Sequence, residues 1–458
     1  MTTRNQPSRM RKKPKNRLLE RTAQNGVCAL SITCRAATAT KQPSAQLTAT
    51  KPAAGRKTAP MKPRFAKNKV LVVFNTVSLY GMERSVIETF EALQPEVQST
   101  FILNRANDRR QTPLLAEMKR SGLPFRYFSD TRDWPRFGKP RSVRAVFGIL
   151  AALIQGNANV LRAAWGADAL YLPIVTSAYI SVLAALWLRV RHRKVIYFFH
   201  DLPSTYSARL RPAVSLCTDL VHNAQRSLTL AASANPFILA RHNSIIPPAI
   251  RIRQSGSLSG PADLSRKNIV FVGQIAPHKG VDLLIEAFST LAGAYRELHL
   301  WLAGGVYDEN RAWFDSSLRN SPHQDRIHCL GYYDGVHELL KSAYVLAIPT
   351  RPSCFQESFG RVAAEAMAVG VPSVCFKSGA LEEIVVHRET GLICDAESAA
   401  CLAANIDEFI RQPAFRDLCG RNARQRYEQH YSENIVRRDW LNLLDRTLPL
   451  SQFPESTS

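Results

Sequence analysis

The sequence predicts an α/β protein built from two doubly wound parallel-sheet domains that face each other across a cleft. Short apolar runs alternate with helix-like stretches along most of the chain, a pattern typical of parallel sheets joined by right-handed crossovers. A polar segment rich in Ser, Gly and Pro, residues 251–267, interrupts this alternation and is interpreted as a linker. The 458 residues, of which 45% are hydrophobic, suffice for two sizeable cores.

The first domain is predicted over residues 67–250. Its expected strands are Val70–Asn75, Thr100–Leu103, Phe125–Phe128, Ala169–Leu172 and Lys194–Phe199, and its expected helices are Met82–Leu93, Ser142–Ile154 and Ala178–Leu188. The run KVIYFF, which forms the last of these strands, is continuously apolar, β-branched and aromatic, as expected of a strand buried on both faces.

The second domain is predicted over residues 268–430 and begins with the strand-like run NIVFVGQ. Further strands are expected within Leu298–Gly305, Arg326–Tyr333, Tyr344–Thr350 and Val371–Phe376, each followed by a Gly or Pro turn and a helix. A long amphipathic helix is expected over Glu433–Thr447, and residues 449–458 form a tail. Because ligands of such sheets bind at the carboxyl ends of the strands, we expect the functional site there.

The net charge of +23 is concentrated at the amino end of the chain. Residues 1–70 contain 17 Lys or Arg and one acid, whereas the remaining 388 residues contain 43 bases and 36 acids. The folded part is therefore only mildly basic, which suits a protein that binds anionic ligands or an anionic membrane surface. No nucleic-acid partner is expected, because no basic face interleaved with aromatic residues accompanies the tail.

Residues 1–66 are rich in Lys, Arg, Thr, Ala and Pro, a composition that does not support a packed core. We therefore expect a disordered basic tail. Three interpretations of it remain open: a tail that touches anionic lipid, an Arg-rich transit-like peptide, and a segment that precedes a translation start at Met61.

The nine cysteines form no CxxC pair and no zinc-ligand spacing, so they predict reduced thiols in a cytosolic protein. The uncharged run Ala169–Leu188 is long enough to span a bilayer. It contains Pro173, Thr176, Ser177 and Ser181, however, and it divides into a strand, a turn and a buried helix. We therefore prefer the globular interpretation of this run to the transmembrane one.

The most informative segment is 349–372, PTRPSCFQESFGRVAAEAMAVGVP, in which seven residues separate Glu357 from Glu365. The step Phe359–Gly360 precedes a helix expected over Arg361–Val369. Free backbone N–H groups at the start of this helix can bind an anion such as a phosphate. Glu365 lies inside the helix and can accept hydrogen bonds from a pair of sugar hydroxyls. The alternative is a surface helix with two solvated glutamates.

A second segment, GQIAPHKGVDLLIEAF, places Gly273 and Gln274 at a strand end and Lys279 where a helix begins. A lysine at the positive end of a helix dipole is slightly unfavourable, which favours an anionic partner over a solvated side chain. In the first domain, His200 follows the strand KVIYFF and is expected to face the cleft. The alternative is that His200 pairs with its neighbour Asp201.

These motifs resemble the donor-site signature of the retaining glycosyltransferases of the GT-B fold, family 4 or group 1. The resemblance rests on the E-x7-E segment above all, and it covers roughly Lys69 to Leu448, more strongly in the C-terminal half. It implies two facing Rossmann-like domains with an interdomain cleft. It also implies a C-terminal helix, over residues 431–448, that crosses back onto the first domain.

The resemblance implies a role for each matching residue of the second domain. Glu357 would orient the donor sugar, Glu365 would hold the ribose, and Lys279 would stabilise the diphosphate beside Gly273 and Gln274. The main chain at Phe359, Gly360 and Arg361 completes the donor site, and the segment Gly331–Asp334 would lie beside the base.

In the first domain the resemblance implies that His200 lies near the sugar and the acceptor and that Gly81 lets the backbone approach the diphosphate. Two positions depart from the family pattern, because Gln274 replaces the arginine of G-R-x5-K-G and Tyr80 replaces the first glycine of G-G-x-E. We expect Arg361 to supply the missing positive charge, and Tyr80 to crowd the approach that a glycine would allow.

The expected function is retaining, metal-independent transfer of a sugar from a nucleotide-diphosphate sugar to a glycan or lipid-linked acceptor. The resemblance implies front-face attack, no cofactor beyond the donor, and a place in cell-surface polysaccharide biosynthesis. We expect a cytoplasmic protein with peripheral contact to the inner face of the plasma membrane. The alternative is a catalytically weak GT-B scaffold that binds a nucleotide sugar or a partner enzyme.

Overall fold

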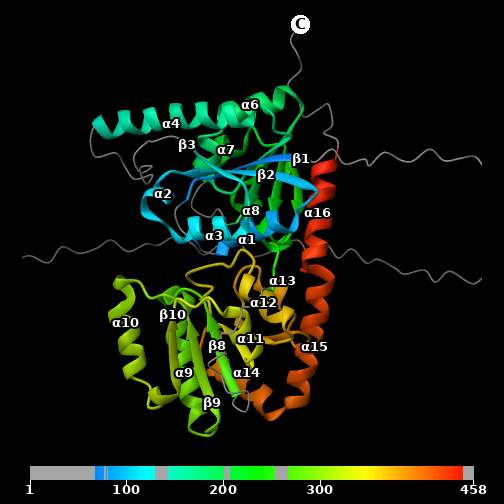
Figure 1. Ribbon diagram of the computed structural model, residues 1–458. Coiled ribbons are helices and arrows are strands. Elements are labelled where there is room, and N and C mark those ends of the chain that lie inside the picture. Colours follow the sequence, from blue (N-terminus) through cyan, green and yellow to red (C-terminus); the bar gives the residue numbers. More distant parts are fainter. Residues whose placement is uncertain are drawn as a thin grey trace, which may run out of the picture. The chain divides into compact units, whose positions relative to one another are not determined.

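The computed structural model describes residues 68–76, 79, 81–128, 143–200, 207–252 and 267–446. These residues form two parallel sheets with helices on both faces (Figure 1). The first sheet has the strand order β3-β2-β1-β4-β5-β6-β7 and the second has the order β10-β9-β8-β11-β12-β13. Both orders proceed outward in two directions from the first strand of the sheet, which defines a doubly wound domain. The predicted fold class is therefore confirmed.

The elements of the first domain follow the predicted alternation. Its strands are β1 Asn68–Phe74, β2 Val97–Asn104, β3 Phe125–Phe128, β4 Ala169–Leu172, β5 Lys194–Phe199, β6 Asp219–His222 and β7 His242–Ile245. Its helices are α1 Gly81–Ala92, α2 Ala106–Arg110, α3 Pro113–Ser121, α4 Val143–Ala164, α5 Val175–Tyr179, α6 Val182–Val190, α7 Ser207–Val214, α8 Gln225–Ala234 and η1 Pro236–Ala240.

Two helix predictions differ from the structure. The helix expected over Ala178–Leu188 is divided into α5 and α6, and the helix expected to end at Ile154 continues to Ala164. In the additional part of this helix, the polar side chain of Asn157 bonds to the last residue of α5 and to α6. Its amide donates to the carbonyl oxygen of Tyr179 and accepts from the backbone N–H of Leu183, each at 3.0 Å.

The stretch Val146–Ala164 of α4 is long and apolar enough to cross a membrane, judged by its length and composition. This is a different stretch from the run Ala169–Leu188 that the sequence suggested. Length and hydropathy alone do not separate a membrane span from a helix of a globular domain.

The second domain repeats the architecture of the first. Its strands are β8 Lys267–Val272, β9 Leu298–Ala303, β10 Ile327–Gly331, β11 Val345–Ile348, β12 Ser373–Phe376 and β13 Gly391–Cys394. Its helical elements are η2 Pro277–Lys279, α9 Val281–Ala292, α10 Asp308–Arg319, η3 Gln324–Arg326, α11 Val336–Lys341, α12 Arg361–Ala368, α13 Leu381–Ile384, α14 Ala399–Arg411 and α15 Pro413–His430.

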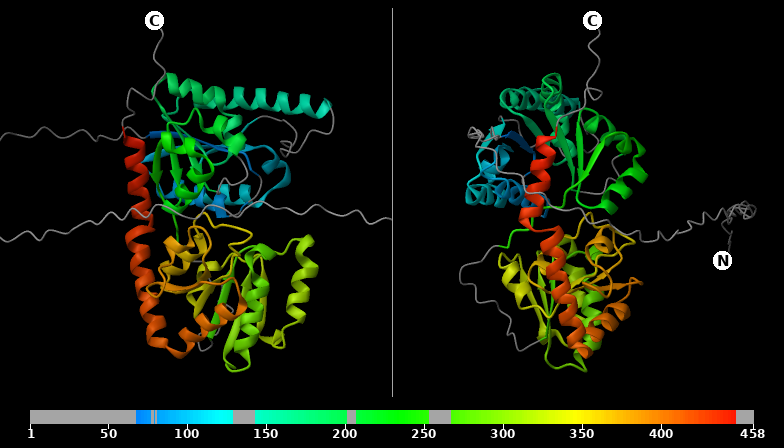
Figure 2. Two further views of the ribbon diagram at one scale, coloured as in Figure 1. Left: turned by 180° about the vertical axis from the view of Figure 1, so that it is seen from behind. Right: turned by 90° about the vertical axis from the view of Figure 1, so that its right-hand side faces the viewer.

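Helices cover both faces of each sheet, as Figures 1 and 2 show, and an apolar cluster lies on each face. Consecutive residues of β1 belong to different apolar clusters, since Val72 faces the cluster that contains α1 and Val73 faces the cluster that contains α6. The same alternation separates Ile269 and Val270 in the second sheet. This explains why the strands are almost continuously apolar.

The last described helix, α16 (Glu433–Asp445), packs on the first domain although it follows the second domain in sequence. Val436, Trp440 and Leu443 belong to the same apolar cluster as β1 and α1. The indole of Trp440 lies 5.6 Å from the ring of Tyr171 and 5.8 Å from the ring of Phe198. Most of the predicted linker and both predicted tails lie outside the described residues, so those boundaries stay predictions.

Replacing Trp440 with alanine should lower the free energy of unfolding of the first domain by roughly 3–5 kcal/mol, because it removes a buried aromatic side chain. Urea unfolding followed by circular dichroism measures this change. The control Leu418→Ala removes a side chain that is 46% exposed on α15, and it should change the free energy by less than about 0.5 kcal/mol. An unchanged midpoint in the tryptophan variant would contradict the packing of α16.

Candidate functional site

A cavity of about 1360 Å³ is lined by residues from both α/β domains. The first domain contributes the amino end of α1, and the second contributes the carboxyl ends of β8, β9 and β11. Of the predicted site residues, the structure brings together Gly81, Gly273, Gln274, Lys279, Glu357, Gly360, Arg361 and Glu365 on the cavity wall. The side chains of Phe359 and His200 are not part of that wall.

Glu357 lies in the loop between β11 and α12. Only one of its two carboxylate oxygens is hydrogen-bonded to other described residues. Oε1 accepts hydrogen bonds from Lys279 Nζ at 2.6 Å and from Thr350 Oγ1 at 2.8 Å. Among the described residues, Oε2 has no protein partner, so it is free to accept hydrogen bonds from a ligand hydroxyl. The side chain is 15% exposed, so such a bond would form in a largely desolvated place.

The backbone of Glu357 is fixed by the turn that follows β12. The N–H of Ala380 donates to the Glu357 carbonyl oxygen at 2.7 Å, and the N–H of Gly379 donates to the side chain of Gln356 at 2.7 Å. Gly379 has φ +56°, and a Cβ at this position would lie 2.1 Å from the carbonyl oxygen of Glu357. Only glycine therefore allows this close contact between the two loops.

Lys279 reaches the cavity from η2, which connects β8 to α9. Its ammonium group lies 4.6 Å from the ring centroid of Phe355, a cation–π contact, in addition to its bond to Glu357. Arg351 fixes the turn that carries Lys279, because its guanidinium donates to Pro277 O at 3.0 Å and pairs with Asp282 at 2.6 Å. The lysine is therefore held beside the end of β11.

The amino end of α12 faces the cavity, as the sequence predicted. Gly360 precedes the helix in the left-handed region, with φ +85°, and no side chain caps the helix. Gly360, Arg361 and Val362 line the cavity. A helix start without a side-chain cap leaves backbone N–H groups available to an anion.

Phe359 does not line the cavity. Its side chain is buried in the apolar cluster behind the cavity and makes an edge-on contact with Tyr431, with the ring centroids 5.6 Å apart. The phenylalanine therefore anchors the start of α12 in the core.

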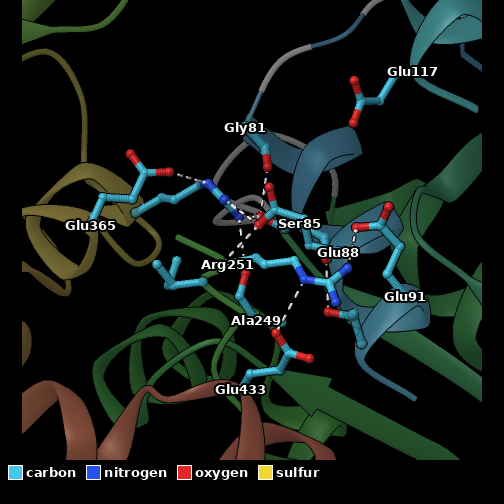
Figure 3. Close-up of polar contacts among 12 residues, drawn as sticks. Gly81, Ser85, Glu88, Glu91, Glu117, Ala249, Arg251, Glu365 and Glu433 are labelled. Carbon is cyan, nitrogen blue, oxygen red and sulfur yellow. Dashed lines mark hydrogen bonds and ion pairs between the residues drawn. The ribbon is translucent and has the colours of Figure 1, made fainter. Parts of the chain in front are cut away.

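Glu365 and Arg361 form an ion pair within α12, with Nε and Oε1 2.8 Å apart. The guanidinium of Arg361 also bonds to residues of the first domain, namely Glu88 at 2.5 Å, Ser85 Oγ at 3.1 Å and the carbonyl oxygen of Ala249 at 3.2 Å. Figure 3 shows Glu365 on one side of this cluster and Ser85 and Glu88 on the other. Burial lowers the pKa of Arg361, but the carboxylates of Glu88 and Glu365 outweigh burial and raise the pKa overall.

We expected Arg361 to meet the diphosphate, but in the structure its guanidinium is already bound to two carboxylates. A diphosphate could reach it only by replacing one of these partners. The role of Arg361 on the diphosphate therefore stays a prediction. The hydrogen bonds of Arg361 connect α12 to the first domain.

His200 directly follows β5 and is buried, with its ring centroid 4.2 Å from that of Phe198 and its Nε2 3.3 Å from the hydroxyl of Tyr171. Burial lowers the pKa of His200 to about 3, so the ring is neutral at neutral pH. The ring does not line the cavity, which differs from our expectation. Its carbonyl oxygen does accept a 2.5 Å bond from Ser358 Oγ in the loop of Glu357. Asp201 and Tyr80 lie outside the described residues.

Several cavity residues escaped the sequence analysis because their partners are distant in sequence. Arg84 on α1 donates to the hydroxyl of Tyr332 at 2.6 Å and lies 3.5 Å from Asp334, both within the segment expected beside the base. Glu88 shows no sequence signal beyond an acidic residue on a buried helix. Arg251 lies 3.2 Å from Glu91, a pair that Figure 3 also shows.

No group of three or more His, Cys, Asp or Glu side chains is placed to hold a metal ion in the part of the chain that the structure describes. The expectation of metal independence stays a prediction.

Comparison with known proteins relates this geometry to a family. Residues 259–426 match the family model of the glycosyl transferases group 1. The chain is 28% identical over 179 residues to an uncharacterized glycosyltransferase of Methanocaldococcus jannaschii, and 27% identical over 172 residues to the capsular polysaccharide biosynthesis glycosyltransferase CapM of Staphylococcus aureus. These alignments cover 39% and 37% of this chain and 44% and 43% of the relatives, so the chain spans less than half the length of either relative.

The structure is similar to that of HepE from Anabaena in complex with UDP, with a TM-score of 0.66 and 20% identity. The similarity covers 82% of this chain and 99% of HepE. The protein therefore has a GT-B fold. The match to the group 1 glycosyl transferases is confined to residues 259–426, which hold most of the second domain.

Because His200 is buried, we expect the folded protein to lose stability in mild acid. Its pKa is about 3 in the folded state and near 6.5 when unfolded, so between these values only the unfolded chain binds the proton. The free energy of unfolding should fall by up to about 1.4 kcal/mol per pH unit as the pH drops below 6.5. Urea titrations at pH 7 and pH 5 should show a shallower loss in His200→Gln. The control His323→Gln should keep the wild-type pH dependence, and an equal slope in all three proteins would contradict the assignment.

Proposed function

We propose that the protein is a retaining glycosyltransferase of family 4 that moves a sugar from a nucleotide-diphosphate sugar to a glycan or lipid-linked acceptor, without a metal ion or a further cofactor. One observation carries the proposal. Lys279, Glu357, Glu365 and the uncapped start of α12 meet on the wall of a single cavity at the carboxyl edge of the second sheet. These groups match the three parts of such a donor, namely diphosphate, sugar and ribose.

The leaving diphosphate would take the positive charge of Lys279 and the N–H groups of Arg361 and Val362. Both kinds of donor act on the charge that develops as the bond between C1 of the sugar and the diphosphate oxygen breaks. The acceptor hydroxyl then bonds to C1 on the same face, and its proton passes to the departing diphosphate. The retaining outcome rests on the family resemblance.

The two glutamates would position the donor. Oε2 of Glu357 would accept hydrogen bonds from the sugar hydroxyls, while Lys279 and Thr350 hold the other oxygen. Glu365 would bind the ribose hydroxyls through Oε2, because Arg361 holds its Oε1. Such fixed geometry lowers the entropy cost of bringing the reacting atoms together. HepE binds UDP and UDP-glucose, which supports a UDP-sugar as the first donor to test.

The acceptor and the place of action are further parts of the proposal. CapM acts in capsular polysaccharide biosynthesis, which supports a glycan or lipid-linked acceptor in cell-surface polysaccharide biosynthesis. We propose a cytoplasmic protein that works at the inner face of the plasma membrane. Lipid-linked acceptors are held at a membrane, so peripheral contact would bring the enzyme to its substrate.

A second candidate, a catalytically weak scaffold that binds a nucleotide sugar or a partner enzyme, is favoured by the charges in the cavity. Gln274 adds no charge where the family has an arginine. The basic side chains on the cavity wall already have carboxylate partners, so a diphosphate has to compete for them. The pairs are Lys279–Glu357, Arg361–Glu88, Arg361–Glu365, Arg84–Asp334, Arg251–Glu91 and Arg120–Glu117.

Transfer activity should depend on three side chains. Glu357→Gln, Glu365→Gln and Lys279→Ala should each lower kcat/KM at least about 100-fold, because each removes an interaction with the donor or with the leaving group. The assay follows release of the nucleoside diphosphate in the presence of acceptor. The matched control is Glu286→Gln, an exposed carboxylate on α9, which should retain wild-type activity. Full activity in all three site variants would exclude sugar transfer at this cavity.

Nucleotide binding tests both candidates, and donor turnover distinguishes them. A thermal-shift screen with UDP, GDP, ADP and their sugars should show stabilisation by at least one nucleotide, equivalent to about 2.7 kcal/mol at a hundredfold excess over Kd. Glu365→Gln and Lys279→Ala should reduce the shift. Binding accompanied by donor turnover supports the enzyme, whereas binding without turnover on any acceptor supports the scaffold. No shift with any nucleotide would contradict both.

A further inference from the structure

An apolar surface covers α4 and α6 of the first domain, on the other side of the sheet from α1. Fourteen large hydrophobic side chains are exposed among the described residues, and nine of them lie on these two helices or directly after α4. We call these nine residues the α4–α6 face. They are Val146, Phe147, Leu150, Ile154, Trp165, Val182, Leu183, Leu186 and Val190.

The spacing of these residues is the same on both helices. Exposed apolar residues fall at positions i, i+1, i+4 and i+8, starting from Val146 on α4 and from Val182 on α6. This spacing places them on one side of each helix. The two helices lie against each other, since the rings of Trp165 and Trp187 stack with their centroids 4.6 Å apart. Figure 1 shows α4 beside α6, and Figure 2 shows both from two further sides.

The opposite sides of both helices are fixed in the domain core. Val160 and Ala164 of α4 and Ala184 and Leu188 of α6 are buried in the same apolar cluster. To cross a bilayer, α4 would have to leave this cluster. The face therefore suits contact with the surface of a bilayer, with the helices lying in its plane.

The charges around the α4–α6 face indicate which kind of surface it would contact. Neither helix contains an Asp or Glu, and Asp168 is the sole acid in the sequence from Val143 to His200. Arg162 and Arg191 are exposed at the carboxyl ends of the helices, and the guanidinium of Arg191 lies 5.3 Å from the ring centroid of Trp187. Tryptophan beside arginine is typical of the boundary between acyl chains and headgroups. A second copy of the same basic helices would bring like charges together.

We propose that the α4–α6 face docks on a bilayer surface that contains anionic lipids. Its apolar side chains enter the boundary between headgroups and acyl chains, and its arginines pair with lipid phosphates. Residues 1–70 contain 17 bases and one acid, and they supply a second attraction to the same surface. The inference deepens the proposed membrane location and rests on it. Docking is measured without donor or acceptor, so its failure is separable from a failure of sugar transfer.

The test is co-sedimentation of the full chain with vesicles of phosphatidylcholine, alone or with about 30% phosphatidylglycerol. The wild type should bind the anionic vesicles. The triple variant Phe147→Ser, Ile154→Ser, Val190→Ser should bind at least tenfold more weakly, because it removes three side chains that are 63–74% exposed. The matched control Leu239→Ser alters a side chain that is 66% exposed elsewhere on the same domain, and it should change binding less than twofold.

High salt distinguishes vesicle binding through the α4–α6 face from vesicle binding through the basic tail. Binding through charge alone weakens steeply at about 1 M salt, whereas the difference between wild type and triple variant should persist there. Equal binding by the two proteins at high salt, or no binding to any vesicle, overturns the proposal. A wild type that is dimeric by light scattering, with a monomeric triple variant and unchanged vesicle binding, assigns the face to a second copy and also overturns it.

A second measurement is independent of the folding of the triple variant. Brominated lipids should quench the fluorescence of Trp165, seen as the difference between wild type and Trp165→Phe on anionic vesicles. The substitution keeps an exposed aromatic residue, so it leaves the domain intact. An identical degree of quenching in the two proteins would place the face away from the bilayer.

Discussion

The candidate site depends on one constraint, the direct pairing of β8 with β11 in a parallel sheet. Val345 pairs with Ile269 and Leu346 pairs with Val270, so both strands end at the same edge of the sheet. The loop after β8 carries Lys279 and the loop after β11 carries Glu357, which lie 78 residues apart in sequence and 2.6 Å apart in space. This kind of site forms where two neighbouring parallel strands are not consecutive in the chain, because both strands carry their following loops to the same edge of the sheet.

Charge pairing is the second organising feature of the cavity. The Arg361 side chain is only 15% exposed, and a guanidinium so far removed from water is tolerated only where carboxylates and hydrogen-bond acceptors surround it. Its partners come from both domains, and one of them, Glu88 of α1, also lines the cavity. A ligand that binds Glu365 or the start of α12 therefore acts next to a contact between the domains.

The helices on the two faces of the first domain's sheet differ in what they contact. On one side of the sheet, α1 contributes Arg84 and Glu88 to the cavity. On the same side, Trp440 of α16 packs into the apolar cluster. On the other side, α4 and α6 bury one face and leave apolar side chains in water. Exposed apolar residues gathered on two adjacent helices mark a contact surface more often than scattered ones do. This surface therefore lies on the other side of the first domain's sheet from α1, the helix that lines the cavity.

Local pattern was enough to predict most strands and the edge of the sheet where the site lies. The run KVIYFF is β5, and FRYF is β3, residue for residue. The strands β6 and β7 were missed because DLVH and HNSI are four residues long and partly polar. Their pairing with neighbours in the sheet, and not their own composition, makes them strands.

The sequence by itself determined the doubly wound class and the positions of Lys279, Glu357 and Glu365 in loops and in a helix near strand ends, because hydrophobic period and turn residues are local signals. Only the tertiary structure decided that Arg361 pairs with Glu88, that the ring of His200 is buried and that Phe359 faces the core. The partners of these side chains are brought together by strand order and helix packing over tens to hundreds of residues. No local pattern encodes which distant charge or ring will lie beside a given side chain.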